Sequence, residues 1–435
     1  MKLEPKQNER EFREMLAQKV SGTSVGLWLL IPEYLRLGTW DTLRAWSGER
    51  SWDIDTRMAM QLVNESALCI NRVRKKNSLG HQGFQLANGM GRLVTDEQVN
   101  LLLDSHTMGD AQEMMVNLGI QRQLSGHYRQ GPIAIDPHRI LSTSKRSMAK
   151  KRKMPSQPSQ KMLQTFFSVD VQSGQPIMFT MSSTGMPTTR ATKELLGLTG
   201  RVVRNESLLL ADKEHFTQEL LSYVRNSSRF DLLTPVLNTK KLKMIMQQLE
   251  YTPLWAGFAI AESEYFFNNS KMPFRLLAQR TGERQEDYCF NAFITTSQES
   301  AQTLVCQHYD KRWTVENFFN FEKKMGLDRT ATHNLNIRYG RLAMAMVAQA
   351  ACFQLRRNLK KKCVKWDAMH LAREVLAYCE GDVKVKGDTI LVTFYGCADH
   401  IIKNRYENLP AILRKENINP KIPWLYDFKL DFRFK

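Results

Sequence analysis

Apolar and polar positions divide the chain into a helical first part and a strand-rich middle. Over residues 1–125 the apolar positions recur at helical spacing, in segments separated by Gly and polar residues, and no strand pattern competes. We therefore predict a mostly helical N-terminal domain. Its short helices are compatible with a helix-turn-helix that lies on DNA, and equally with a helical bundle that binds no DNA.

The pattern changes to strands near residue 131. One apolar segment ends on Asp136, and the continuous apolar run 207–211 ends on Asp212. A continuous apolar run is typical of a central strand that is buried on both faces. Two β-rich runs, 162–171 and 176–181, are joined by Gln-Ser-Gly-Gln and predict a hairpin. The middle of the chain therefore predicts an α/β fold in which two strands each end on an aspartate.

The second half begins with further strands and continues with helices. Residues 231–308 are again β-rich and are interpreted as an insertion. A helix is predicted to begin at Tyr309, a second at residues 335–362 and a third at residues 366–379. One strand at residues 389–395 is expected before an irregular tail.

The charge of the chain favours a polyanionic partner. Lys and Arg number 62 against 44 Asp and Glu, a net charge of +18, which points first to nucleic acid. Two basic clusters contribute: Lys145, Arg146, Lys150, Lys151, Arg152 and Lys153, and later Arg356, Arg357, Lys360, Lys361, Lys362 and Lys365. Charge runs are also common on solvated surfaces, so neither cluster identifies a site by itself.

The cysteines and the N-terminus indicate a compartment inside the cell. Seven cysteines are scattered without zinc-ligand or CxxC spacing, and their odd number argues against a full set of disulfides. We expect reduced thiols, as in the cytoplasm. The sequence shows neither a signal-peptide pattern nor an apolar run long enough to cross a membrane. No Gly-rich phosphate loop is present, so no nucleotide cofactor is expected.

The most specific pattern is Tyr309, Arg312, Glu316 and Lys323, which would share one stripe of a continuous helix. One interpretation is an internal ion-pair ladder, because Arg312 and Glu316 are neighbours on any helix. That interpretation leaves Asp136 and Asp212 unexplained. Three converging carboxylates are the oxygen ligands that Mg²⁺ prefers.

These residues resemble the signature of bacterial insertion-sequence transposases of the DDE class. The Tyr-Arg-Glu-Lys spacing matches, the segment 211–216 is similar to the second-aspartate motif of that family, and Ile135-Asp136 is similar to the first. The resemblance extends over about residues 130–360. It implies an RNase H-like mixed-sheet core flanked by helices, with a β-rich insertion before the glutamate helix.

The resemblance also implies roles for individual residues. Asp136, Asp212 and Glu316 would be catalytic and would bind two Mg²⁺ or Mn²⁺ ions. The residues that would contact DNA are Tyr309, Arg312, Lys323, Lys145, Arg146 and Lys213. Lys213 stands where the family often has Arg. Relatives that excise through a DNA hairpin use a Trp of the insertion, where this chain has Phe290 and Phe293.

From the resemblance we predict a domain order and a function. The domains are a helical DNA-end-binding domain (1–125), the first part of the catalytic core (126–230), the insertion (231–308), the second part of the core (309–365) and a C-terminal region (366–435). The function would be metal-dependent cleavage at transposon ends and strand transfer into target DNA by a homodimer, on double-stranded DNA in the bacterial cytoplasm. Two alternatives remain: a non-catalytic, transposase-derived DNA-binding protein, and an RNase H-like structure-specific nuclease.

Overall fold

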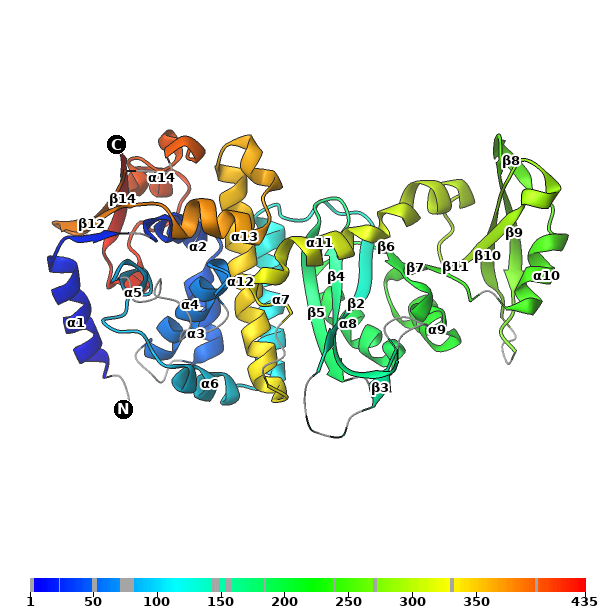
Figure 1. Ribbon diagram of the computed structural model, residues 1–435, viewed down its shortest axis with the longest axis horizontal. Coiled ribbons are helices and arrows are strands. Elements are labelled where there is room, and N and C mark those ends of the chain that lie inside the picture. The colour runs from blue at the N-terminus through cyan, green and yellow to red at the C-terminus, as the bar shows by residue number, and fades with distance from the viewer. Residues whose placement is uncertain are drawn as a thin grey trace. The chain divides into compact units, whose positions relative to one another are not determined.

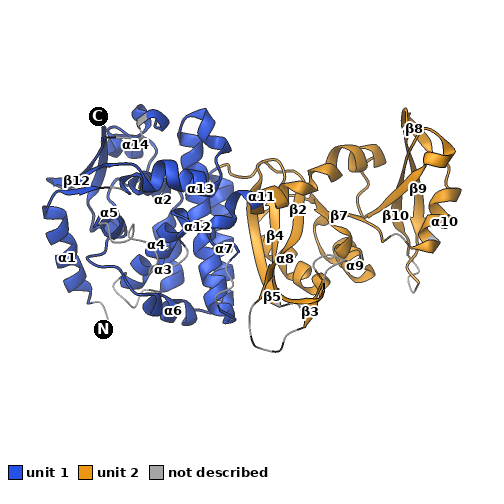
Figure 2. Ribbon diagram, viewed as in Figure 1, with its two compact units in different colours: residues 1–125, 320–435 blue, residues 126–319 orange. Residues whose placement is uncertain are grey.

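The chain folds into two compact units (Figure 2), formed by residues 126–319 and by residues 1–125 together with 320–435. The computed structural model describes residues 4–22, 24–48, 53–70, 82–142, 145, 147, 149–152, 158–183, 185–237, 239–268, 272–328, 332–395 and 398–435. Within these ranges, no helix is both long and apolar enough to cross a membrane.

The unit of residues 126–319 is built on a mixed sheet whose core strands lie in the order β5-β4-β2-β6-β7 (Figure 1). These strands are β2 (Ile133–Leu141), β4 (Gln160–Asp170), β5 (Gln175–Ser183), β6 (Ser207–Ala211) and β7 (Phe230–Pro235). β2, β4 and β5 are joined antiparallel, whereas β2, β6 and β7 run parallel. The predicted α/β class is confirmed, and this order is the one expected of an RNase H-like core.

Helices cover the core sheet and explain its apolar runs. α8 (Thr188–Val202) packs on β4 and β5, and α9 (Gln218–Ser227) packs on β7. The inward face of α8 carries residues at helical spacing: Ala191, Leu195, Leu196, Thr199 and Val202. β6 lies between two parallel neighbours, and its apolar run is buried as predicted.

The β-rich insertion extends the core sheet. It contains α10 (Lys240–Gln248), β8 (Thr252–Trp255), β9 (Phe258–Tyr265), β10 (Phe274–Thr281) and β11 (Cys289–Thr295). β11 pairs antiparallel with β7, and β10, β9 and β8 follow in antiparallel order. The insertion is therefore anchored on the strand that lies beside β6.

The other unit is mainly helical and is organised around α12 (Leu335–Asn358). Most of the length of α12 is buried, and it packs against α4 and α7 (Figure 1). The remaining helices of this unit are α1 (Pro5–Ala17), α2 (Ile31–Arg36), α3 (Thr39–Ser47), α4 (Ile54–Ala67), α5 (Gln82–Ala87), α6 (Asp96–Asp104), α7 (Met108–Leu124), α13 (Ala368–Leu371) and α14 (Leu409–Lys415). The predicted helix at 335–362 is confirmed, although it ends at Asn358.

The helical unit also holds a four-stranded sheet that the sequence pattern did not predict. Its strands are β1 (Val20–Gly22), β12 (Gly381–Lys386), β13 (Thr389–Phe394) and β14 (Lys429–Phe434). The expectation of an irregular tail was wrong, because β14 pairs parallel with β13. β1 is too short for a strand pattern, and its pairing with β12 joins segments far apart in the sequence.

The cysteine prediction also needs a correction. Cys379 is disulfide-bonded, whereas reduced thiols were expected throughout. Free thiols in the described part of the chain are Cys69, Cys289, Cys306, Cys352 and Cys363.

The helical stretch predicted to begin at Tyr309 is confirmed, but it is not one uniform α-helix. A π-helix (Thr303–His308) is followed by a 3-10 helix (Tyr309–Trp313), then by α11 (Thr314–Glu322) and by a further 3-10 turn (Lys323–Met325). The angle per residue differs between these helix types, so the sequence spacing does not translate into one straight stripe.

Candidate active site

The two aspartates stand at equivalent positions on adjacent parallel strands. β2 pairs with β6 so that Ile135 lies opposite Ala211. Asp212 follows Ala211, the last residue of β6, whereas Asp136 follows Ile135 inside β2, which continues to Leu141. The prediction that each strand ends on its aspartate is therefore confirmed for Asp212 and wrong for Asp136. Neighbouring strands in a sheet lie about 4.8 Å apart, so the register brings the two carboxylates to the same edge of the core.

The third carboxylate comes from the segment that crosses these strands. The 3-10 helix Tyr309–Trp313 packs against both β2 and β6. It leads directly into α11, whose first turn carries Glu316. Phe318 and Phe319 on α11 anchor it by packing their rings against Phe167 of β4, at centroid distances of 5.5 and 5.2 Å.

Asp136 lies in the electrostatic field of the other two carboxylates. Burial and the negative charge of Asp212 raise the pKa of Asp136 to about 7, and Glu316 contributes in the same direction. The charges of His215 and Arg312 oppose this rise without cancelling it. The local potential is therefore negative enough to favour a proton or a cation at Asp136.

Asp212 is held in place by its own loop and by β7. His215 Nδ1 donates a hydrogen bond to Asp212 Oδ1 (2.9 Å), and the backbone N–H of Glu214 donates to the same oxygen (3.0 Å). Thr234 Oγ1 donates to the backbone carbonyl of Asp212 (2.7 Å). Burial alone would raise the pKa of Asp212, but these donors and the charge of His215 lower it.

Glu316 and Tyr309 both interact with Arg312. Arg312 Nη2 donates to Glu316 Oε1 (2.9 Å), and the guanidinium lies close enough to Asp136 and Asp212 to lower the pKa of both. Burial raises the pKa of Tyr309 to about 12, against the opposing charge of Arg312. The Tyr309 ring packs edge-on against Phe293 of β11 (4.5 Å), which connects the site to the insertion.

A second ion cluster fixes the loop after Asp212. Glu214 forms ion pairs with Arg139 of β2 and with Lys151 of β3 (Lys150–Lys151), the latter at 3.1 Å. Because Arg139 lies on the same strand as Asp136, this cluster ties the loop that carries Asp212 to β2. Glu214 and Arg139 were not predicted as site residues, and their identities alone gave no signal.

His215 is a site residue that was not among the predicted ones. It is buried, with 1% of its surface exposed, and it binds Asp212 directly. Its position three residues after Asp212 was the signal that could have found this contact. His138 stacks on Phe319 (4.3 Å) and packs beside the site.

In the described part of the chain, none of the remaining predicted DNA contacts forms an ion pair with these carboxylates. Lys145 and Lys213 are exposed. Lys323 is partly exposed and belongs to the helical unit. Arg146 lies outside the described residues.

The three carboxylates have the donor atoms that a divalent cation prefers, but they are not arranged as a set of metal ligands. Asp136, Asp212 and Glu316 offer only oxygen donors, as Mg²⁺ and Mn²⁺ prefer. Among the residues that the structure describes, no three acidic, His or Cys side chains lie close enough together to hold a metal ion. Arg312 and His215 instead supply the positive charge near the carboxylates.

The fold and this site define an α/β enzyme with acidic residues on adjacent parallel strands. The model of the family described as "Transposase DDE domain" matches residues 128–350, just over half of the chain. The chain belongs to this family. Family membership assigns it to DNA transposition and to the enzymes that carry it out, which generally use divalent metal ions.

Two further comparisons were made. A solved structure described as a piggyBac transposase synaptic complex with hairpin DNA is similar at 12% identity, with a TM-score of 0.44 and 82% of each chain covered. No curated protein sequence matches the chain.

Proposed function

We propose that the chain is an insertion-sequence transposase that cleaves DNA at the ends of its element and transfers the freed 3′-hydroxyl into target DNA. The observation that carries this proposal is the register of β2 with β6, which places Asp136 and Asp212 side by side, next to the segment that carries Glu316. An acidic site in a transposase-family core is suited to phosphodiester chemistry.

Different residues of the site would bind the metal ions and the DNA. Asp136, Asp212 and Glu316 would hold two Mg²⁺ or Mn²⁺ ions, which activate a nucleophilic oxygen and stabilise the leaving oxygen when bound. Arg312, which donates a hydrogen bond to Glu316, would turn part of its guanidinium towards the DNA. There it would bind a phosphate of the scissile strand through two N–H groups. Tyr309 would keep its proton at neutral pH and donate a hydrogen bond to the same strand.

The partners follow from the same proposal. The substrates would be the terminal inverted repeats and target DNA, bound as double strands by a homodimer in the bacterial cytoplasm. The exposed lysines Lys145, Lys213 and Lys323, together with Arg146, would contact the DNA backbone.

The test is a cleavage assay on DNA that carries the ends of the element. The purified chain is compared with Glu316→Gln and with the control Glu264→Gln, which removes an exposed carboxylate from β9 of the same unit. We expect cleavage in Mg²⁺ or Mn²⁺ by the unmodified chain and by the control, and none by Glu316→Gln, although all three bind the DNA.

The outcomes separate this function from its alternatives. Binding without cleavage by the unmodified chain, in either metal, would contradict the proposal and favour a non-catalytic DNA-binding protein. Cleavage that follows DNA shape and ignores the terminal sequence would favour a structure-specific nuclease.

A further inference from the structure

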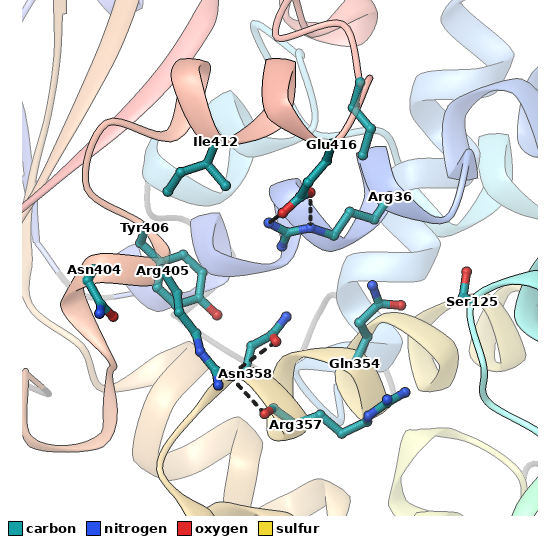
Figure 3. Close-up of a pocket in the computed structure, with 11 residues that line it drawn as sticks. Arg36, Ser125, Gln354, Arg357, Asn358, Asn404, Arg405, Tyr406, Ile412 and Glu416 are labelled. Carbon is teal, nitrogen blue, oxygen red and sulfur yellow. Dashed lines mark hydrogen bonds and ion pairs between the residues drawn. The ribbon is translucent and has the colours of Figure 1, made fainter.

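A polar cavity of about 800 Å³ lies within the helical unit (Figure 3). Its walls come from the C-terminal turn of α12, the turn Lys403–Arg405, the end of α14, and α2. Arginine and amide side chains dominate the lining, and Glu416 is its only carboxylate among the described residues.

The arginines of the cavity differ in whether acidic side chains neutralise their charge. Arg36 is neutralised, because it pairs with Glu416 (2.8 Å) and with the buried Glu33 (3.0 Å). Arg405 donates to the carbonyl of Arg357 (3.0 Å) and to Asn358 (3.3 Å), which are neutral acceptors.

Arg357 is exposed, and its guanidinium lies over the ring of Phe353 at 5.6 Å. Neither Arg357 nor Arg405 forms an ion pair within the described ranges. The cavity thus presents two positive charges without a counter-charge (Figure 3).

A buried hydroxyl in the wall also lacks a partner. Tyr406 is 1% exposed, and its hydroxyl makes no hydrogen bond to any residue that the structure describes. A buried polar group without a partner costs about 1 to 3 kcal/mol, so such groups are normally satisfied by water or by a ligand. The hydroxyl is a donor suited to an anionic oxygen beside the two arginines.

The positive charge continues beyond the cavity. Burial lowers the pKa of His400, and the charges of Lys362 and Lys360 lower it further against the opposing charges of Glu374 and Asp399. The backbone N–H of Lys360 donates to the carbonyl of His400 (3.1 Å), which joins this surface to the end of α12. Two further cations therefore lie beyond the cavity, partly offset by two acidic groups.

We propose that this cavity, with Arg357 and Arg405 at its centre, binds backbone phosphates of double-stranded DNA as a second DNA contact in the helical unit. The proposal rests on the proposed function, which makes DNA the substrate. A polyanion with regularly spaced charges fits the extended row of cations better than a single small anion does. Arg357 and Arg405 would bind phosphate oxygens through their forks, and Lys360 and Lys362 would contact neighbouring phosphates.

The test measures the salt dependence of DNA binding by the full chain. The probe is a fluorescein-labelled duplex of about 30 base pairs and arbitrary sequence, titrated in EDTA from about 50 to about 200 mM KCl. Arg357→Gln and the double variant Arg357→Gln/Arg405→Gln are compared with Lys384→Gln/Lys386→Gln. This control removes two exposed charges from β12 of the same unit.

We expect the double variant to bind roughly tenfold more weakly at about 0.1 M salt, with the slope of log K against log salt reduced by about one for each lost contact. Arg357→Gln should show about half of this effect. It is the safer variant for folding, because this exposed side chain makes no hydrogen bond in the described ranges. Arg357→Lys/Arg405→Lys should restore most of the slope.

Three outcomes would overturn the proposal. If the double variant keeps the affinity and slope of the β12 control while the unmodified chain still cleaves element ends, this site is wrong and the proposed function stands. If inorganic phosphate binds the unmodified chain calorimetrically and not the variant, while DNA affinity is unchanged, the cavity is a small-anion site. If the unmodified chain binds no duplex, both proposals fail.

Discussion

Two glutamates on α11, Glu322 and Glu316, differ in burial and in the hydrogen bonds that their carboxylates accept. Glu322, in the helical unit, is 3% exposed, and both of its oxygens accept hydrogen bonds from Arg356 (2.7 and 3.1 Å), with a third from Gln349 (3.1 Å). Glu316, in the α/β unit, is one-third exposed and has a single partner, Arg312. It also adds to the negative potential around Asp136.

The difference separates a structural charge from a functional one. A buried ion pair whose carboxylate oxygens both accept hydrogen bonds contributes a fixed arrangement and leaves neither oxygen free to bind a ligand. At an accessible site, carboxylates that repel one another destabilise each other's ionised form. A bound cation removes this repulsion and is therefore favoured. We therefore expect substitutions at the two sites to affect different measurements.

The largest effect is expected for Asp212→Asn. Loss of this carboxylate should slow cleavage of the element ends by about a thousandfold or more while the melting temperature changes little. Single-turnover kinetics would measure this loss, with Asp231→Asn on the neighbouring strand β7 as the matched control. Asn at that position can still accept the hydrogen bond from Thr296. Equal rates for the two variants would show that Asp212 has no catalytic role.

The reverse result is expected for Glu322→Ala. Removing this partner leaves Arg356 buried and unpaired, which should lower the free energy of unfolding by about 3 to 5 kcal/mol. Urea denaturation would measure the loss. The double variant Glu322→Leu/Arg356→Met should recover most of it, because it replaces the pair with apolar side chains. A stable Glu322→Ala variant with impaired cleavage would instead place Glu322 in the active site.

A smaller effect is expected for His215→Phe. Phe fills the buried space but cannot donate to Asp212, so cleavage should slow by roughly 10- to 100-fold and should need more Mg²⁺. A rate measured as a function of Mg²⁺ concentration would reveal the shift. His138→Phe is the control, because His138 stacks on Phe319 beside the site. An unchanged Mg²⁺ requirement in His215→Phe would show that His215 only packs.

The smallest effect concerns Asp382, a compensated carboxylate of the helical unit. Burial alone would raise the pKa of Asp382, but hydrogen bonds from Lys19 (2.7 Å), Ser21 (2.5 Å) and Tyr395 lower it to about 2. Because the folded pKa lies below the unfolded value of about 4, this stabilisation is present above pH 4 and is lost as the pH falls towards 2.

Asp382→Asn should therefore lose stability less steeply than the unmodified chain between about pH 4 and pH 2. Thermal melts across this range would compare the two slopes. Parallel curves would indicate that Asp382 is not held ionised by its three donors.

The sequence predicted the elements whose pattern is local. The apolar runs before Asp136 and Asp212 identified β2 and β6, because strands buried on both faces are continuously apolar. The hairpin β4–β5 and the helix α12 were visible for similar reasons. The equivalence of the two aspartates depends on the register of β2 with β6, which no local pattern encodes.

Other features were hidden because they depend on packing between distant segments. The 3-10 turn Tyr309–Trp313 contacts β2 and β6, and Tyr309 packs on Phe293, so a spacing rule for regular α-helices did not predict its helix type. β1 and β14 pair with strands far away in the sequence. The sequence did not distinguish the members of the basic cluster at residues 356–365. In the structure, Arg356 is buried in an ion pair, whereas Arg357 lines a cavity.

The most direct test of the central claim is the binding of Mn²⁺ in the absence of DNA. Calorimetry or electron paramagnetic resonance would compare the unmodified chain with Asp136→Asn/Glu316→Gln and with the control Asp231→Asn/Glu264→Gln. We predict that the chain and the control bind Mn²⁺ alike and that the site variant binds at least about tenfold more weakly. Equal binding by all three would contradict the assignment of these carboxylates as the metal site.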